Sequence, residues 1–318
     1  MNYLITGGSG CVGSYVIRDL LARGEKIINY DLSRQQNILR QVVEPEGLIE
    51  LISVTGDVTD LPLLARTIKD HKIDAILHLA SLQIPASNAN PPLAERVNIG
   101  GLINVLEAAR VLDVRKVVWS SSIAVFGPAA EYGNKPIAND AHQRPQSVYG
   151  ACKAFGEYLL NYYTDTYGLD VIGLRYTAIY GVGREVGRTS FTTEMIRRAA
   201  QNLPYAVPFG DDRIDWQYVE DVSRVTIRAL DSPRTNTRVF NTQGDVRSVA
   251  EGVSFLKKLE PRAQLTLLPG KLGLAWEYDC EPAKRELGFE PQFAMEQGIE
   301  KTFDYYRANV LVTAGGER

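Results

Sequence analysis

The stretch "YLITGGSGCVGSYVIRDLLARG" (residues 3–24) decides the fold of this 318-residue chain. Its first four residues, which are mostly apolar, predict a short buried β-strand, and the residues from about 11 to 23 predict a helix. Gly7, Gly10 and Gly13 stand three residues apart at the junction between the two elements. A glycine-rich turn between a first strand and a first helix is typical of a β-α-β unit.

The chain repeats this alternation of strand and helix up to about residue 176. Long helices are predicted over 93–112 and 148–168. The strand segments are nearly continuous in apolar residues, as expected where helices cover both faces of a parallel sheet. We therefore predict an α/β fold with a doubly wound parallel sheet. The predicted strands cover residues 3–6, 26–31, 48–54, 74–80, 116–121 and 170–176.

The alternation loosens after residue 176, where the glycine-rich segment "YGVGREVG" (180–187) comes before shorter strands and helices. We expect a nucleotide-binding domain over 1–176 and a smaller mixed α/β C-terminal lobe for substrate over 177–318. The two are expected to interleave, with some segments, for example about 215–245, returning to the first domain.

Composition excludes several classes of function. The formal net charge is −3 and no long basic run occurs, so a nucleic-acid or anionic-membrane surface has no electrostatic support. The first residues lack the pattern of a secretion signal, and no stretch approaches the length of a membrane span. Three widely separated cysteines and three separated histidines show no metal-ligand spacing. We expect a cytoplasmic protein with reduced thiols and no metal.

The glycine turn predicts a dinucleotide site. Residues 8–13 read GxGxxG, in which a glycine lets the backbone approach a pyrophosphate, and the helix N-terminus then offers free N–H groups. Asp31 ends the second predicted strand 18 positions after Gly13, where a carboxylate accepts hydrogen bonds from an adenosine ribose. This acid favours NAD over NADP, although Arg34 is compatible with a 2′-phosphate. The predicted phosphate-binding residues are Gly7, Gly10, Cys11, Val12 and Gly13.

A second motif predicts acid–base chemistry. Tyr149 and Lys153 are four residues apart on a predicted helix and share a face. A free tyrosine has a pKa of about 10, and a nearby lysine together with a positive nicotinamide ring would favour the phenolate. Tyr149 would then exchange a proton with an alcohol or carbonyl during hydride transfer, while Ser122, after the strand at 116–121, orients the reacting oxygen.

These motifs resemble the extended short-chain dehydrogenase/reductase family, in its NAD-dependent epimerase/dehydratase branch. "TGGSGCVG", "SSSIAVFG" and "YGACK" occur in the family's order, and similar segments extend over roughly residues 3–230. The stretch from 98 to 128 is also similar to short-chain-type threonine dehydrogenase. The resemblance implies a Rossmann fold, with Ser122, Tyr149 and Lys153 as catalytic residues and Asn98 supporting the lysine through water. It also implies cofactor contacts at Asp57, Val58, Leu79, Ala80, Ser81, Tyr149, Lys153 and Tyr176.

The substrate half departs from the pattern of family members that act on nucleotide-diphosphate sugars. Ala178 stands where they have asparagine, and Ile214 and Leu268 stand where they have arginines that hold a diphosphate. Buried phosphate needs charge-assisted partners, so we expect a small hydroxy or keto substrate: a free sugar, sugar acid, hydroxy acid or aldehyde. The predicted substrate contacts are Gln83, Ser122, Tyr149, Ala178 and Arg184.

Two other functions stay open at this stage. One is a nucleotide-diphosphate-sugar 4-epimerase or dehydratase with tightly bound NAD, in which Arg184 or Arg213 replaces the missing arginines. The other is an NAD-sensing binding module without turnover, which the intact serine, tyrosine and lysine disfavour. By resemblance, the helix that carries Tyr158, Tyr162 and Tyr163 is expected to form a homodimer interface.

Overall fold

A computed structural model of the chain describes residues 1–33 and 36–314. Its centre is a seven-stranded sheet in which every neighbouring pair is parallel, in the order β10-β6-β5-β4-β1-β2-β3. This confirms the predicted doubly wound parallel sheet. The strands are β1 (Asn2–Thr6), β2 (Lys26–Asp31), β3 (Ile52–Thr55), β4 (Ala75–His78), β5 (Lys116–Ser122), β6 (Val171–Tyr176) and β10 (Val239–Asn241).

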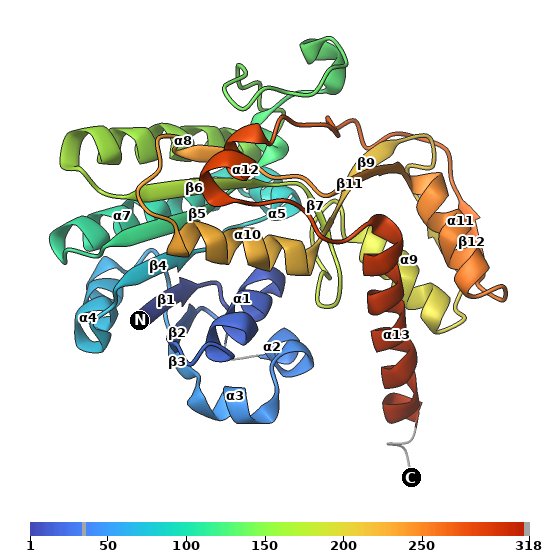
Figure 1. Cartoon of the computed structure of the whole chain (residues 1–318), viewed down its shortest axis with the longest axis horizontal. Helices are drawn as coiled ribbons and strands as arrows, with labels where there is room; N and C mark the ends of the chain where they lie inside the picture. The colour runs from blue at the N-terminus through green and yellow to red at the C-terminus, as the bar shows by residue number, and fades with distance from the viewer. Residues whose placement is uncertain (34–35, 315–318) are drawn as a thin grey trace.

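Helices cover both faces of this sheet (Figure 1). Because successive side chains of a strand point to opposite faces, Tyr3 and Ile5 of β1 join one apolar core, whereas Leu4 joins the other. The first core includes residues of α1 (Cys11–Leu21) and α10 (Val219–Asp231), and the second includes residues of α4 (Leu61–His71), α7 (Gly101–Val111) and α8 (Val148–Tyr167). Burial on both faces explains the continuous apolar runs of the strand sequences.

Two predicted elements have different bounds in the structure. The strand predicted over 48–54 was wrong in its first half, since α3 (Pro45–Glu50) occupies these residues and β3 starts only at Ile52. Pro45 favours this helix because proline is well tolerated at the first helical position. The helix predicted over 93–112 is three pieces: α6 (Pro91–Ala94), a π-helical turn η1 (Glu95–Gly100) and α7. Such a π-turn is common at functional sites.

The C-terminal part builds two small sheets, with strand orders β11-β9-β7 and β12-β8. The chain also returns to the large sheet, where β10 pairs with β6 and α10 packs beside α1. In Figure 1 these small sheets and their helices lie to the right of the large sheet. Their elements are β7 (Ala178–Tyr180), α9 (Phe191–Ala200), β8 (Tyr205–Val207), β9 (Arg213–Tyr218), β11 (Asp245–Ser248), α11 (Val249–Leu259), β12 (Leu265–Leu267) and α13 (Met295–Ala314). Shorter helices are α2 (Asn37–Val42), α5 (Ile84–Ala89), η2 (Ile123–Val125), η3 (Ala129–Tyr132) and α12 (Glu281–Leu287).

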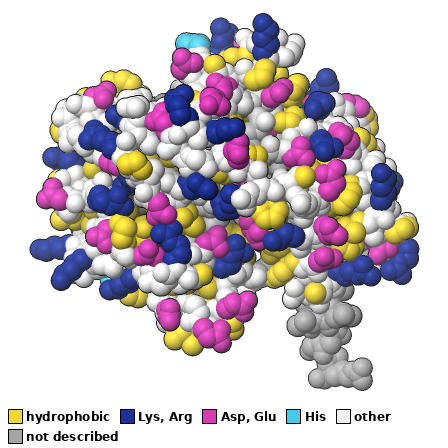
Figure 2. All heavy atoms as spheres, viewed as in Figure 1, with side chains coloured by type: hydrophobic (Ala, Val, Ile, Leu, Met, Phe, Trp, Pro, Cys, Tyr) yellow, Lys and Arg dark blue, Asp and Glu magenta, His cyan; other side chains and the backbone are white. Residues whose placement is uncertain are grey.

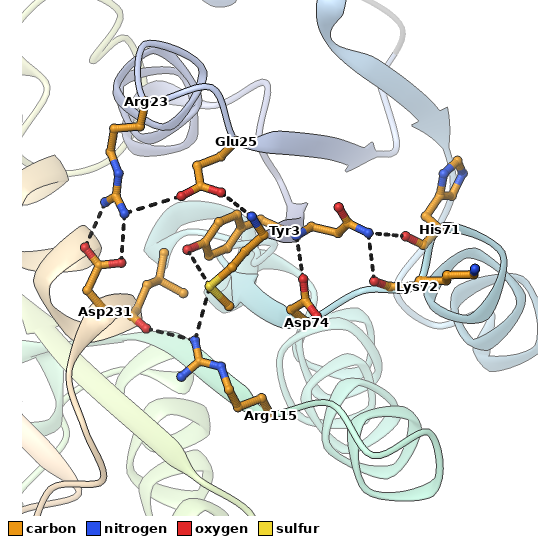
Figure 3. A network of polar contacts seen from close by, with 11 residues as sticks. Tyr3, Arg23, Glu25, His71, Lys72, Asp74, Arg115 and Asp231 are labelled. Atoms are coloured by element: carbon orange, nitrogen blue, oxygen red, sulfur yellow. Dashed lines mark hydrogen bonds and ion pairs between the residues drawn. The ribbon is translucent and has the colours of Figure 1, made fainter.

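A polar network connects the amino ends of β1 and β4, at the edge of the large sheet opposite the glycine turn (Figure 3). Asp74 accepts a hydrogen bond from the backbone N–H of Asn2 at 2.7 Å, and the side chain of Asn2 donates to the carbonyl oxygens of His71 and Lys72 at 3.0 Å each. Arg23 pairs with Asp231 at 2.8 Å and so joins the ends of α1 and α10. All of these groups have protein partners, so this edge is occupied by structural contacts.

The surface carries charges of both signs. Figure 2 shows lysines and arginines interspersed with aspartates and glutamates over the visible face. Among the described residues, no helix is long and apolar enough to cross a membrane.

Candidate active site

The carboxyl ends of the parallel strands bring the predicted site residues to one edge of the large sheet. Thr6 at the end of β1 is in register with His78 at the end of β4, and Ser122 at the end of β5 is in register with Tyr176 at the end of β6. This edge is where open α/β sheets bind their ligands.

The glycine turn presents unpaired amides to this edge. Gly10 caps α1 in an extended conformation without a side-chain hydrogen bond. Within the described part of the chain, the N–H groups of Cys11, Val12 and Gly13 have no acceptor. A β-carbon on Gly13 would lie 2.5 Å from the α-carbon of Gly8, so the close approach of helix and turn requires glycine here. Free amides and the positive end of a helix dipole fit a pyrophosphate.

Asp31 stands beside this turn at the end of β2. One of its carboxylate oxygens accepts from the N–H of Ser9 and the other from the N–H of Ser33, both at 3.0 Å. These two bonds fix the side chain next to the phosphate turn and leave lone pairs on both oxygens for hydroxyl donors. Arg34 lies outside the described residues.

The other predicted cofactor residues lie in turns along the same edge. Asp57 holds the turn after β3, since one carboxylate oxygen accepts from the N–H of Thr59 at 2.8 Å. Val58 is buried in the core under α7. Leu79, Ala80 and Ser81 directly follow β4, and the N–H of Leu79 donates to the carbonyl of Thr6 at 3.0 Å. The structure therefore gathers these residues around the ends of β1, β3 and β4.

The serine, tyrosine and lysine meet where α8 begins. Ser147 caps this helix by accepting from the N–H of Gly150 at 3.0 Å, which places Tyr149 and Lys153 in its first two turns. The Nζ atom of Lys153 lies 5.4 Å from the centroid of the Tyr149 ring and donates to the carbonyl of Ser120 on β5. The Ser122 hydroxyl accepts a hydrogen bond from the N–H of Ala124 at 3.1 Å, and it acts on the phenol of Tyr149 by lowering its pKa.

Burial shifts the pKa values of Tyr149 and Lys153 in opposite directions. It raises the pKa of Tyr149, while Ser122 and the positive charge of Arg184 act in the opposite direction. Burial also lowers the pKa of Lys153 to about 7. Lys153 was the expected source of the charge that favours the phenolate, but in the protein alone the cation that lowers the Tyr149 pKa is Arg184. A buried ammonium is costly, which is why the lysine loses its proton so readily.

Two residues named by the resemblance form hydrogen bonds with other parts of the chain. Asn98 lies in the π-turn, and its amide accepts from the N–H of Leu82 at 2.8 Å and donates to the carbonyl of the same residue at 3.2 Å. Its side chain thus holds the loop after β4, and support of Lys153 through water stays a prediction. The hydroxyl of Tyr176 bonds to Thr226 of α10 at 2.6 Å.

Of the remaining predicted substrate contacts, Gln83 and Arg184 lie near the same loop glycine. Gln83 begins α5 after β4, and Arg184 lies on the loop after β7. A β-carbon built on Gly187 would lie 2.9 Å from Nη2 of Arg184 and 3.5 Å from Oε1 of Gln83, so the two side chains meet beside this glycine. Ala178 is buried within β7. Sequence reasoning missed Gly187 and Thr189, although the glycines of 180–187 indicated an unusual loop.

His78 is buried and held by Thr6. Its Nδ1 atom lies 2.7 Å from the Thr6 hydroxyl, and burial with the nearby charge of Lys153 lowers its pKa to about 3, so the ring is neutral. Across the described residues, no group of three or more histidine, cysteine, aspartate or glutamate side chains is placed to hold a metal ion.

Comparison with known proteins identifies relatives over nearly the whole chain. The sequence model of the NAD dependent epimerase/dehydratase family matches residues 3–242. A UDP-glucose 4-epimerase of Mycolicibacterium smegmatis is 29% identical, over 96% of this chain and 99% of that protein. The structure resembles the Thermus thermophilus UDP-glucose 4-epimerase complex with NAD, at a TM-score of 0.84 and 26% identity over 96% of this chain and 99% of that one. It also resembles an L-threonine dehydrogenase from Phytophthora infestans, at 0.82 and 26% over 97% and 100%.

Proposed function

Because the chain belongs to the NAD dependent epimerase/dehydratase family, we propose that it interconverts a small hydroxy compound and its keto or aldehyde form at Ser122, Tyr149 and Lys153. The protein is an extended short-chain dehydrogenase/reductase that uses NAD. One observation carries the proposal: Nζ of Lys153 lies 5.4 Å from the centroid of the Tyr149 ring and donates to Ser120 on β5, the strand that Ser122 ends, at the edge of the sheet where the free amides of α1 fit a dinucleotide.

The three residues have distinct roles in this proposal. When bound, NAD supplies the hydride chemistry. Tyr149 accepts the proton of the substrate hydroxyl, or returns it to the carbonyl, and Ser122 holds the same oxygen by a hydrogen bond. Lys153 donates to the carbonyl of Ser120, which fixes its ammonium group under the Tyr149 ring, and it holds the nicotinamide ribose. Gly7, Gly10 and the first turn of α1 hold the pyrophosphate, and Asp31 holds the adenosine ribose.

The substrate lobe supports a substrate smaller than a nucleotide sugar. Ile214 is buried in the apolar core. Leu268 directly follows β12, and its N–H donates to the carbonyl of Val207. Neither position offers a charge to a diphosphate. Arg213 is exposed and is held over the ring of Trp276 at 5.3 Å.

A second candidate is a nucleotide-diphosphate-sugar 4-epimerase or dehydratase, because relatives over the full chain are named UDP-glucose 4-epimerase and dTDP-glucose 4,6-dehydratase. The two candidates differ in a measurement of ligand binding. UDP-glucose raises the unfolding temperature of the NAD-loaded protein under the second candidate only.

The experiment that tests the proposal compares NADH formation by the wild type and Tyr149→Phe over a panel of alcohols, free sugars and hydroxy acids. Loss of the general base should reduce kcat by about 10²- to 10⁴-fold while NAD still binds. Tyr167→Phe, at the far end of the same helix, is the matched control and should keep the wild-type rate. Equal rates for the wild type and Tyr149→Phe would reject the assignment of the base.

We also propose the wider organisation of the protein. Residues 1–176 would form the NAD-binding domain and 177–318 the substrate lobe, with about 215–245 returning to the first domain, since α10 and β10 pack on the large sheet. Phe155, Tyr158 and Tyr162 expose aromatic rings on α8, which supports a homodimer through this helix. Sedimentation of the wild type against Tyr158→Glu tests this interface. Three free cysteines support a cytoplasmic location.

A further inference from the structure

One cation at the candidate active site has no anionic partner. Arg184 forms no ion pair with any described residue, and its Nε atom is buried without a hydrogen-bond acceptor. Its one side-chain hydrogen bond, from Nη2 to the hydroxyl of Thr189, is long at 3.4 Å. A buried guanidinium donor normally finds an acceptor, so Nε of Arg184 lacks an acceptor that a ligand would supply.

The loop around Arg184 leaves room for its guanidinium. Gly187 has a φ of +103°, a conformation that favours glycine, and a β-carbon there would lie 2.9 Å from Nη2. Any larger residue would therefore crowd the guanidinium. The amide of Gln83 lies on the other side of the same glycine and has no hydrogen-bond partner within the described part of the chain.

Arg184 and Tyr149 interact electrostatically. The charge of Arg184 acts to lower the pKa of the Tyr149 phenol, so the guanidinium lies within electrostatic reach of the acid–base group. A molecule that gives a hydroxyl to Tyr149 and carries an anionic group can therefore direct that group toward Arg184.

The surroundings of Arg184 match a single negative charge. The side chains near Nη2, Gln83 and Thr189, are neutral hydrogen-bonding groups. Arg188, the next arginine, is exposed and donates to the carbonyl of Leu272 at 2.8 Å. A carboxylate and a phosphate can each take two parallel hydrogen bonds from one edge of a guanidinium. A single guanidinium balances the one charge of a carboxylate, whereas a phosphate group carries about −1.5 to −2 at pH 7.

We propose that Arg184 binds the carboxylate of the substrate through Nε and Nη2, with Gln83 as an additional donor, so that the protein acts on a small hydroxy acid rather than on a neutral alcohol or sugar. This inference rests on the proposed function and narrows its substrate class. Arg184 also acts to lower the pKa of the Cys11 thiol, and Sγ of Cys11 lies 3.7 Å from the carbonyl oxygen of Val182, so the loop that carries Arg184 lies near the phosphate turn as well. The experiment therefore has to distinguish the substrate carboxylate from the cofactor diphosphate as the anion that Arg184 binds.

The test uses pairs of probes that differ in their carboxylate: L-threonine and 1-amino-2-propanol, 3-hydroxybutyrate and its methyl ester, and D-galacturonate and D-galactose. NADH formation and the unfolding temperature of the NAD-loaded protein are measured for the wild type, Arg184→Gln, Arg184→Lys and Arg213→Gln. Arg213→Gln is the matched control because this arginine lies exposed on β9. Affinity for NAD is measured separately for each variant.

In at least one pair, the wild type should prefer the acid by about 10- to 150-fold in kcat/KM, the factor that a charge-assisted pair contributes. Arg184→Gln should abolish this preference with NAD affinity unchanged, Arg184→Lys should restore part of it, and Arg213→Gln should keep it. The acid, but not its neutral counterpart, should raise the unfolding temperature of the wild type.

Three results would overturn the inference. Turnover of neutral alcohols or sugars that depends on Tyr149 and matches that of the acids would leave the proposed function standing and reject the carboxylate. Equal losses for both members of each pair in Arg184→Gln, together with weaker NAD binding, would assign the guanidinium to the cofactor. If no probe forms NADH, the proposed function fails, and absence of thermal stabilisation by every acid then rejects the anion site too.

Discussion

Replacing Lys153 by methionine should abolish catalysis and yet stabilise the protein at low pH. The side chain of Lys153 is 1% exposed, and burial lowers its pKa to about 7. An ordinary lysine in the unfolded chain has a pKa of about 10.4. Between these two values the unfolded chain binds more protons than the folded chain, so the free energy of unfolding of the wild type rises with pH in this window.

The magnitude follows from the difference between the two pKa values. At pH 6, Lys153 is largely protonated in both the folded and the unfolded chain, so the folded wild type carries nearly the full free-energy cost of burying an ammonium group. At pH 9.5 most of this cost has gone, because the buried lysine is neutral. Lys153 should therefore add about 3 kcal/mol to the free energy of unfolding between pH 6 and pH 9.5. Lys153→Met lacks this contribution. The substitution also leaves the carbonyl of Ser120 without its donor, at a cost of about 1–3 kcal/mol, but that cost is the same at both pH values.

Urea denaturation of the wild type and Lys153→Met at pH 6 and pH 9.5 measures the effect. The stability of the variant relative to the wild type should be about 3 kcal/mol more favourable at pH 6 than at pH 9.5. Lys135→Met, in an exposed turn, is the control and should show no such difference. A relative stability of Lys153→Met that is the same at both pH values would refute the reasoning, because the lysine would then be equally charged in both states.

Two further predictions concern the glycine turn and the buried histidine. In Gly13→Ala the new β-carbon would lie 2.5 Å from the α-carbon of Gly8, so the helix and the glycine turn must separate at a cost of about 1–3 kcal/mol of stability. NAD should then raise the unfolding temperature of the variant less than that of the wild type. An unchanged NAD-induced shift of the unfolding temperature would contradict this. The folded-state pKa of His78 is about 3, below its unfolded value, so the wild type should lose about 3 kcal/mol of stability from this residue between pH 7 and pH 4. Urea denaturation of His78→Gln should show a loss smaller by that amount, and an equal loss in both proteins would count against a neutral buried imidazole.

Local spacing in the sequence determined the parallel sheet, the family and the candidate cofactor site. The glycines at 7, 10 and 13, the acid at 31 and the tyrosine–lysine pair act within one turn or at one strand end, so their order along the chain already implies their chemistry. The carboxyl ends of parallel strands share one edge, which explains why these residues meet without further information.

Only the tertiary structure decided which groups act on one another across that edge. Arg184 comes from a loop 35 positions after Tyr149, yet its charge is the one that lowers the Tyr149 pKa. The side chain of Asn98 holds Leu82 because a π-turn directs it there. Burial, which sets the pKa of Lys153 and leaves Nε of Arg184 without an acceptor, depends on packing between segments distant in the chain. No local periodicity encodes that packing, so these features became visible only in the folded protein.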